Sequence, residues 1–179
     1  MIMTVNQLKE LIDTGSEKDK VLEAKLQALE ILIRKYTNNN FQQRAIRTVG
    51  TCVSDNNTII CDKIMPFKIG DTIQISKSEY NPDRLCTIAG IKENVLTVYE
   101  DICDEDYVLV TKIAYPADVK VGIANMLQWD IENRSKVGVQ SETISRHSVT
   151  YFNMDGDNSL MGYPKSLVGF LKPYMKARF

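Results

Sequence analysis

The hydrophobic period of this chain changes twice along its length. Near the N-terminus, and again from Pro116 onward, apolar residues recur at the three- and four-residue spacing of an amphipathic helix. Between Arg47 and Ile113 they alternate in short runs separated by turn residues, which indicates antiparallel strands. The pattern predicts an α+β protein: a small helical bundle from residues 1–45 and 114–179, with a small antiparallel, barrel-like β domain inserted at residues 46–113.

Two helices are expected before the β segment. Thr4 and Gln7 have the spacing of a capping box, and Ser16 is the expected cap of a longer second helix that ends at the amide-rich residues 37–40. The main apolar stripe of this second helix comprises Leu22, Leu26, Leu29, Ile33 and Tyr36, and a wider arc adds Val21, Ala24, Ala28, Ile31 and Leu32. Such a broad arc is typical of a helix packed on two sides, within a bundle or partly against another subunit.

The β segment reads as five or six short strands. They are expected at residues 48–53, 58–61, 72–76, 85–91, 95–99 and 107–113. Residues 54–57 and 92–94 have the composition of hairpin turns. This number and spacing of strands suggests a closed or nearly closed antiparallel barrel.

The rest of the chain is expected to return to the helical bundle. A helix is predicted for residues 116–135, followed by a polar stretch at 140–151, a loop at 152–158 and a short helix from Pro164 that ends or kinks at Pro173. The polar stretch must be held by turns, by hydrogen bonds or by a neighbouring subunit. The last residues mix cations with bulky apolar groups, which suits either a solvated terminus or a docking peptide.

Composition excludes several classes of function. The net charge is −1, so the whole chain does not resemble a binder of nucleic-acid polyanions, and DNA contact would have to be local or steric. No signal peptide and no apolar run long enough for a bilayer are expected. Four cysteines, Cys52, Cys61, Cys86 and Cys103, lack the close pairs of a zinc site and are expected to be reduced thiols of a cytoplasmic protein.

No pattern of residues points to catalysis or to a cofactor. His147 has Ser145 and Ser148 nearby but no nucleophile elbow, and the Asp-Gly loop at residues 153–158 lacks the spacing of a calcium loop. An acidic cluster of Glu100, Asp101, Asp104, Glu105 and Asp106 is expected to be a solvated loop, or else a negative surface that repels DNA or meets a basic partner. The expected protein is not an enzyme and has no cofactor or metal.

Four stretches carry a resemblance to a known family. They are a capped Thr4-Val-Asn-Gln-Leu-Lys9 helix, Asp118-Val-Lys-Val-Gly-Ile123, the run from Gly138 to Tyr151, and Gly162-Tyr-Pro-Lys-Ser-Leu167. Over residues 1–40 and 114–179 the chain is similar to the head–tail connector, or adaptor, proteins of tailed bacteriophages and prophages. The β segment departs from that family's mostly helical plan.

The resemblance implies a structural protein of the virion, located at the head–tail interface and in the host cytoplasm during assembly. Its subunits would form a ring, usually of twelve copies, between the portal protein and a stopper or tail-completion protein, and DNA would pass through the lumen without specific binding. The residues expected to dock on the portal are Leu167, Phe170, Leu171, Lys172, Tyr174, Met175, Lys176, Arg178 and Phe179. Those expected to contact a neighbouring subunit are Ser141, Glu142, Arg146, His147, Ser148 and Tyr151.

Two other functions are compatible with parts of the sequence. A small β-barrel could bind nucleic acid or protein, with Tyr80, Arg84 and Tyr99 as its obvious contact residues. A hydrolase would have to use Ser148 or His147. The connector hypothesis adds that residues 163–179 are mobile in the free subunit.

Overall fold

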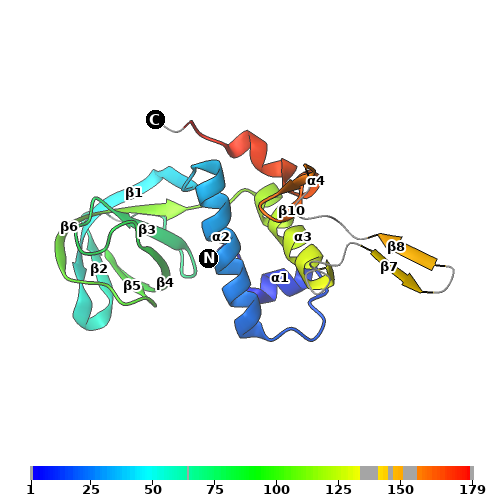
Figure 1. The fold of residues 1–179 in the computed structure, drawn as a ribbon. Coiled ribbons are helices and arrows are strands. Elements are labelled where there is room, and N and C mark those ends of the chain that lie inside the picture. The colour runs from blue at the N-terminus through cyan, green and yellow to red at the C-terminus, as the bar shows by residue number, and fades with distance from the viewer. Residues whose placement is uncertain (1, 64, 134–140, 145–146, 151–156, 178–179) are drawn as a thin grey trace. The chain divides into compact units, whose positions relative to one another are not determined.

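The computed structural model describes residues 2–63, 65–133, 141–144, 147–150 and 157–177, and for 141–144 and 147–150 it describes the backbone alone. The chain divides into two compact units (Figure 1). Unit 1 comprises Met1–Asn39 and Tyr115–Phe179, and unit 2 is the continuous segment Asn40–Ala114. The first boundary falls after Asn39 rather than after residue 45, because the first strand already begins at Gln42.

Unit 1 begins with two helices, α1 (Val5–Leu11) and α2 (Asp19–Thr37). The predicted capping box of α1 is confirmed: the Thr4 hydroxyl accepts the Gln7 amide, and the Gln7 side chain accepts the Thr4 amide. The predicted Ser16 cap is wrong. Helix α2 is capped at Lys18 without a side-chain hydrogen bond, because Ser16 lies in a turn closed by the Glu17 amide on the Thr14 carbonyl.

Helix α3 (Ala117–Asn133) completes the three-helix core of unit 1, in which α1, α2 and α3 pack against one another (Figure 1). A buried pair joins its N-terminal end to α2: the Tyr115 hydroxyl donates to the Glu30 carboxylate at 2.8 Å. Burial and the adjacent Glu30 charge raise the pKa of Tyr115. The fully buried large side chains of unit 1 are Leu8, Leu22, Leu26, Ile33, Ile123, Met126, Leu127 and Leu171.

Short elements complete unit 1. Two strand pairs are present, β7 (Ser141–Ile144) with β8 (His147–Thr150), and β9 (Ser159–Leu160) with β10 (Tyr163–Pro164). The short helix expected at Pro164 is one turn, α4 (Lys165–Val168), which continues as a 3₁₀ helix, η3 (Gly169–Tyr174). Pro173 lies inside η3, which ends one residue later.

Unit 2 is a six-stranded antiparallel sheet. Its strands are β1 (Gln42–Val53), β2 (Thr58–Cys61), β3 (Thr72–Ser76), β4 (Leu85–Lys92), β5 (Val95–Val98) and β6 (Glu105–Ile113). The strand order is β1-β2-β5-β4-β3-β6, and β6 pairs with β1, so every strand has a neighbour on both sides. A 3₁₀ turn, Ser54–Asn56, connects β1 to β2.

The inward-facing side chains of unit 2 form a single apolar cluster. It includes Cys52, Ile59, Cys61, Ile73, Ile75, Cys86, Ile88, Val108 and Val110. The prediction of an α+β protein with an antiparallel sheet is confirmed. Strand β1 begins at Gln42, six residues before the expected start at residue 48. Its first half is polar and does not alternate, so the sequence pattern did not indicate a strand there. This half pairs with β6 across a register shift between Gln42 and Arg47.

Candidate assembly site

Helix α2 has two apolar faces, and they have different environments. The face formed by Leu22, Leu26, Leu29 and Ile33 is buried in the core. The opposite face, which we call the outer stripe, consists of Val21, Ala24, Ala28 and Ile31. All four are exposed in the described structure, Ile31 by 54%. Contiguous exposed apolar surface of this kind marks an interaction site more often than isolated apolar residues do.

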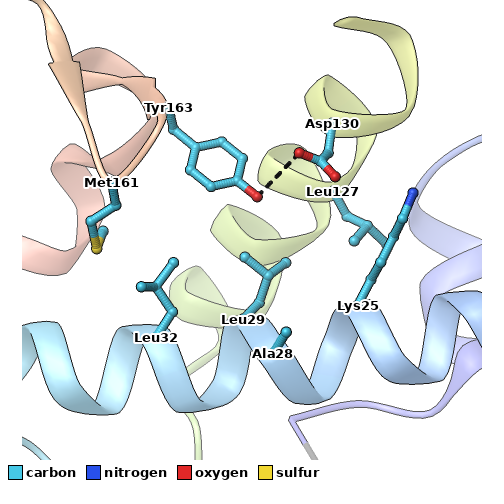
Figure 2. A pocket seen from close by; sticks show the side chains of 8 residues that line it. All are labelled: Lys25, Ala28, Leu29, Leu32, Leu127, Asp130, Met161 and Tyr163. Atoms are coloured by element: carbon cyan, nitrogen blue, oxygen red, sulfur yellow. Dashed lines mark hydrogen bonds between the residues drawn. The ribbon is translucent and has the colours of Figure 1, made fainter. Parts of the chain in front are cut away.

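A cavity of about 340 Å³ adjoins the outer stripe at Ala28. Figure 2 shows Ala28, Leu29 and Leu32 of α2 on one side of it and Tyr163 and Met161 on the other. The remaining lining residues are Lys25, Leu127 and Asp130. Its volume lies at the small end of the range for ligand pockets and suits a few apolar side chains.

The polar groups of the cavity are already engaged. The Tyr163 hydroxyl donates to the Asp130 carboxylate at 3.3 Å (Figure 2), and the Tyr163 ring lies against Trp129 with centroids 5.5 Å apart. Lys25 approaches Glu17 at 3.5 Å. Sequence patterns alone did not predict this cavity. The one indication of it in the sequence was Asp130, a carboxylate at the position that continues the apolar face of Met126 and Leu127.

The described part of the C-terminal segment is hydrogen-bonded to the helices of unit 1, an arrangement that does not favour the expected mobility of residues 163–179. The Tyr174 hydroxyl donates to both carboxylate oxygens of Asp118 at 2.8 Å, and this hydrogen bond raises the pKa of Tyr174. The Lys176 amide donates to the Thr37 carbonyl at 2.8 Å. Asn38 and Asn39 donate from their side-chain amides to the carbonyls of Ala177 and Tyr174, respectively.

These contacts divide the predicted portal-docking residues. Leu171 is fully buried and therefore belongs to the core of unit 1. Leu167, Phe170 and Tyr174 are half-buried, while Lys172, Met175 and Lys176 are exposed. Arg178 and Phe179 lie outside the described residues. The part of the predicted set open to a partner is therefore cationic, with Met175 as its apolar residue.

The predicted subunit-contact residues fall around one strand pair. Ser141 and Glu142 lie in β7, and His147 and Ser148 lie in β8; Arg146 and Tyr151 are outside the described residues. The register pairs Thr143 with Ser148 and Ile144 with His147. Within the described chain neither strand pairs with a third one. Because an isolated two-stranded sheet is marginally stable in water, this pair is a candidate for packing against another chain.

The acidic cluster of unit 2 is not simply a solvated loop, because most of its carboxylates hold neighbouring loops. Asp104 accepts the Ser54 amide at 2.6 Å, Asp101 accepts the Asn57 side chain, and Glu100 accepts the Thr87 amide. The hydrogen bond from the Ser54 amide lowers the pKa of Asp104. These residues organise one end of the sheet.

Glu105 has the densest set of these contacts. Its carboxylate accepts the Ser78 hydroxyl, the Glu79 amide at 2.6 Å and the Asn81 side chain at 3.1 Å. Desolvation raises the pKa of Glu105, but these hydrogen bonds outweigh it and the net pKa is lowered. Asn81 also exchanges two hydrogen bonds with the backbone of Cys103. The loop after β3 is thereby fastened to the loop before β6.

The aromatic residues considered for nucleic-acid binding lie beside these carboxylates. Tyr80 and Tyr99 are 61% and 71% exposed. Tyr80 directly follows Glu79, whose amide binds Glu105, and Tyr99 directly precedes Glu100. Nucleic-acid bases stacked on these rings would bring their phosphates close to the carboxylates, and this repulsion opposes binding.

Three of the four thiols are buried in the sheet and the fourth, Cys103, is exposed. Burial raises the pKa of Cys52 and Cys61 to about 11 and that of Cys86 to about 12. Over the described residues, no group of three or more metal-binding side chains is present. Searched over the same residues, no helix is both long and apolar enough to cross a membrane.

Comparison with known proteins adds no relative. No protein-family model matches the chain, and no curated protein matches its sequence.

Proposed function

We propose that this protein is a structural, non-enzymatic connector between the head and the tail of a bacteriophage. Copies of unit 1 assemble into a ring of twelve beneath the portal protein, and the ring presents a platform for a stopper or tail-completion protein. DNA passes through its lumen without specific binding. In this arrangement residues 40–114 are a β insertion, barrel-like in form, that decorates the ring.

The outer stripe of α2 is the observation that carries this proposal. A subunit in a ring needs apolar surface on more than one side, since each copy contacts a neighbour on either flank. The stripe of Val21, Ala24, Ala28 and Ile31 supplies such a surface next to a cavity, on a helix whose other face is already buried.

Two further features support it. The strand pair β7–β8 lacks a third strand within the described chain and would gain one, or a packing surface, from a neighbouring copy. The exposed cations Lys172 and Lys176 beside Met175 give the C-terminal segment the mixed character of a docking surface. The near-neutral net charge suits a conduit through which DNA must slide.

The test is assembly on the portal. The purified protein is mixed with portal rings, and the complex is measured by mass photometry and imaged by negative-stain electron microscopy. A ring of copies on one face of the portal is the expected result. Ile31→Glu and Ala28→Glu should abolish the ring, because they place a carboxylate in the interface, whereas Ala45→Glu, the same change at an exposed alanine of unit 2, should leave it intact. If the portal particle gains no mass from the wild-type protein, the proposal is refuted.

A further inference from the structure

The last described residues of unit 1 are hydrogen-bonded to the C-terminal end of α2. We call residues 172–177, which follow the fully buried Leu171, the strap. No side chain of the strap is buried: Tyr174 is half-buried and the others are exposed. Hydrogen bonds therefore hold the strap, and Leu171 is the apolar anchor before it. A segment without buried apolar side chains opens locally at a lower free-energy cost than the core does.

Three of these hydrogen bonds end on residues 37–39. The strap donates one backbone amide to the Thr37 carbonyl, at 2.8 Å. The side-chain amides of Asn38 and Asn39 donate to two strap carbonyls, at 2.8 and 3.1 Å. Thr37 is the last residue of α2, and Asn39 is the last residue of unit 1 before unit 2 begins. The strap thus fastens the chain at the end of α2, just before it enters unit 2.

The burial of polar groups agrees with this role. Thr37 is fully buried and Asn39 is 8% exposed, although polar residues of these types are mostly exposed in proteins. The carbonyls of the last turn of a helix have no partner inside the helix, and that of Thr37 obtains one from the strap. Opening of the strap therefore removes three hydrogen bonds from residues 37–39 and returns their polar groups to water.

The second connection between the units is secured in a different way. Tyr115, the first residue of unit 1 after unit 2, is buried, and its hydroxyl donates to Glu30 in the core of unit 1. That hydrogen bond involves no residue of the strap. Of the two connections, the one at residues 37–39 is therefore the one that the strap can loosen.

We infer that the strap controls how freely unit 2 moves on its two connections. While the strap is closed, both connections are fastened to unit 1. When it opens, residues 38–39 are released and Tyr115 remains as the fastened connection. The trigger rests on the proposed function, because part of the set expected to dock on the portal lies on the strap. These residues are Lys172, Tyr174, Met175 and Lys176.

Docking on the portal competes with closure of the strap. The Tyr174 hydroxyl donates to Asp118, so a portal protein that binds Tyr174 has to break that hydrogen bond. A partner that favours the open strap also favours the released state of residues 38–39, because the two are linked. These residues are therefore expected to be more restrained in the free protein than on the portal.

Lys176→Pro tests the hold of the strap in the full-length protein. Proline has no amide hydrogen to donate to Thr37, and Met175 before it has the extended backbone, φ −67° and ψ 130°, that a following proline favours. Hydrogen exchange of the Asn38 and Asn39 amides, measured by NMR, should become about tenfold faster, since loss of the bond favours the open strap. Met175→Ala, at an exposed position of the strap, is the control and should leave these rates unchanged.

A second readout concerns unit 2 itself. NMR relaxation of its backbone amides gives its rotational correlation time, which Lys176→Pro should shorten relative to the wild-type protein and Met175→Ala should not. A strap that stabilised unit 1 alone would change the exchange rates without changing this time. Lys176 is exposed, so the variant is expected to keep the wild-type circular dichroism spectrum, which is checked first.

Exchange measured by mass spectrometry on portal rings tests the trigger. When the wild-type protein binds the portal, exchange should slow in residues 172–177 and become faster in residues 37–39. Slower exchange in both segments would mean that the strap docks without opening. That result would overturn the coupling and leave the connector function standing.

The outcomes separate the strap from the proposed function. If Lys176→Pro leaves the Asn38 and Asn39 amides at their wild-type exchange rates, or leaves the correlation time of unit 2 unchanged, the inference is refuted whatever the portal does. If the wild-type protein does not join the portal, the proposed function fails, and the comparison of Lys176→Pro with the wild type still decides whether the strap restrains unit 2.

Discussion

Replacing Gly122 with alanine should destabilise unit 1, although alanine is the better helix former. Gly122 lies in the buried part of α3, and the Phe170 ring of η3 packs directly over its Cα. A Cβ at position 122 would lie 2.5 Å from Cζ and 2.6 Å from Cδ1 of that ring. Carbon atoms attract one another best at about 3.5–4.0 Å, so the ring and its segment would have to move.

The magnitude follows from two opposing terms. Overpacking of a well-packed contact costs about 1–3 kcal/mol. Alanine in a helix interior gains about 0.5–1 kcal/mol over glycine. With mid-range values of about 2 kcal/mol for the cost and about 0.75 kcal/mol for the gain, Gly122→Ala is expected to lower the free energy of unfolding by about 1 kcal/mol.

Gly169→Ala is the matched control. Gly169 begins η3 in a right-handed helical conformation, with φ −57°, and an added Cβ there has no neighbour within 4 Å. This substitution should leave stability unchanged or raise it by up to about 1 kcal/mol, by restricting the unfolded chain. The two substitutions are chemically identical, and only Gly122→Ala is expected to destabilise the protein.

Urea denaturation followed by tryptophan fluorescence measures the effect. Trp129 is the sole tryptophan and lies in unit 1, so its emission reports on that unit. In a Phe170→Ala background, Gly122→Ala should become stabilising, because the ring that it displaces is gone. If Gly122→Ala stabilises the otherwise wild-type protein as much as Gly169→Ala does, Phe170 does not pack on α3 as described.

Four further predictions concern both units. Leu171→Ala should lower the free energy of unfolding by about 2–5 kcal/mol, because the side chain is fully buried. Met175→Ala, at an exposed position, should lower it by less than about 0.5 kcal/mol. Equal losses for the two variants in urea denaturation would contradict the burial of Leu171. Asp118→Asn weakens the acceptor of the Tyr174 hydroxyl and should speed hydrogen exchange of the Lys176 amide, measured by NMR, while amides inside α2 are unaffected. Because the folded protein lowers the pKa of Glu105, this residue contributes to stability above pH 4.5, and the contribution is lost as the pH falls through the folded-state pKa. In a plot of unfolding free energy against pH, Glu105→Gln should therefore flatten the acid side. Glu93→Gln, in an exposed turn, should leave that side unchanged. Ellman's reagent at pH 8 should titrate Cys103 alone in the native protein and all four thiols after unfolding, and rapid reaction of a second native thiol would rule out the buried positions of the other three.

Local chemistry explains why much of the fold was predictable. The Thr4 and Gln7 capping box, the end of α2 at residues 37–38 and the limits of β3 depend on residues a few positions apart, and all agree with the sequence pattern. Ser16 failed as a cap because a turn closed through Thr14 places it outside the helix, and side-chain propensity alone does not encode that turn.

The site required information that local patterns do not carry. Its cavity is built from α2, α3 and the turn before β10, with Lys25 and Tyr163 far apart in the chain. The acidic residues of unit 2 bind partners many positions away, as Asp104 does with Ser54, so a run of carboxylates could not be distinguished from a solvated loop. The wide apolar arc of α2, in contrast, was readable from spacing, and the structure leaves its outer stripe exposed.

The two ends of unit 2 meet at one point of its sheet. Gln42 is paired with Ile113, and the Ala114 amide donates to the Phe41 carbonyl at 3.0 Å. The polypeptide therefore leaves and rejoins the helical part through neighbouring strands, about 5 Å apart. Excision of the whole segment would leave a gap that two or three glycines can bridge, and the same gap would accept a foreign domain whose termini are adjacent. Gain or loss of this module would therefore change the backbone at one place only, between Asn39 and Tyr115.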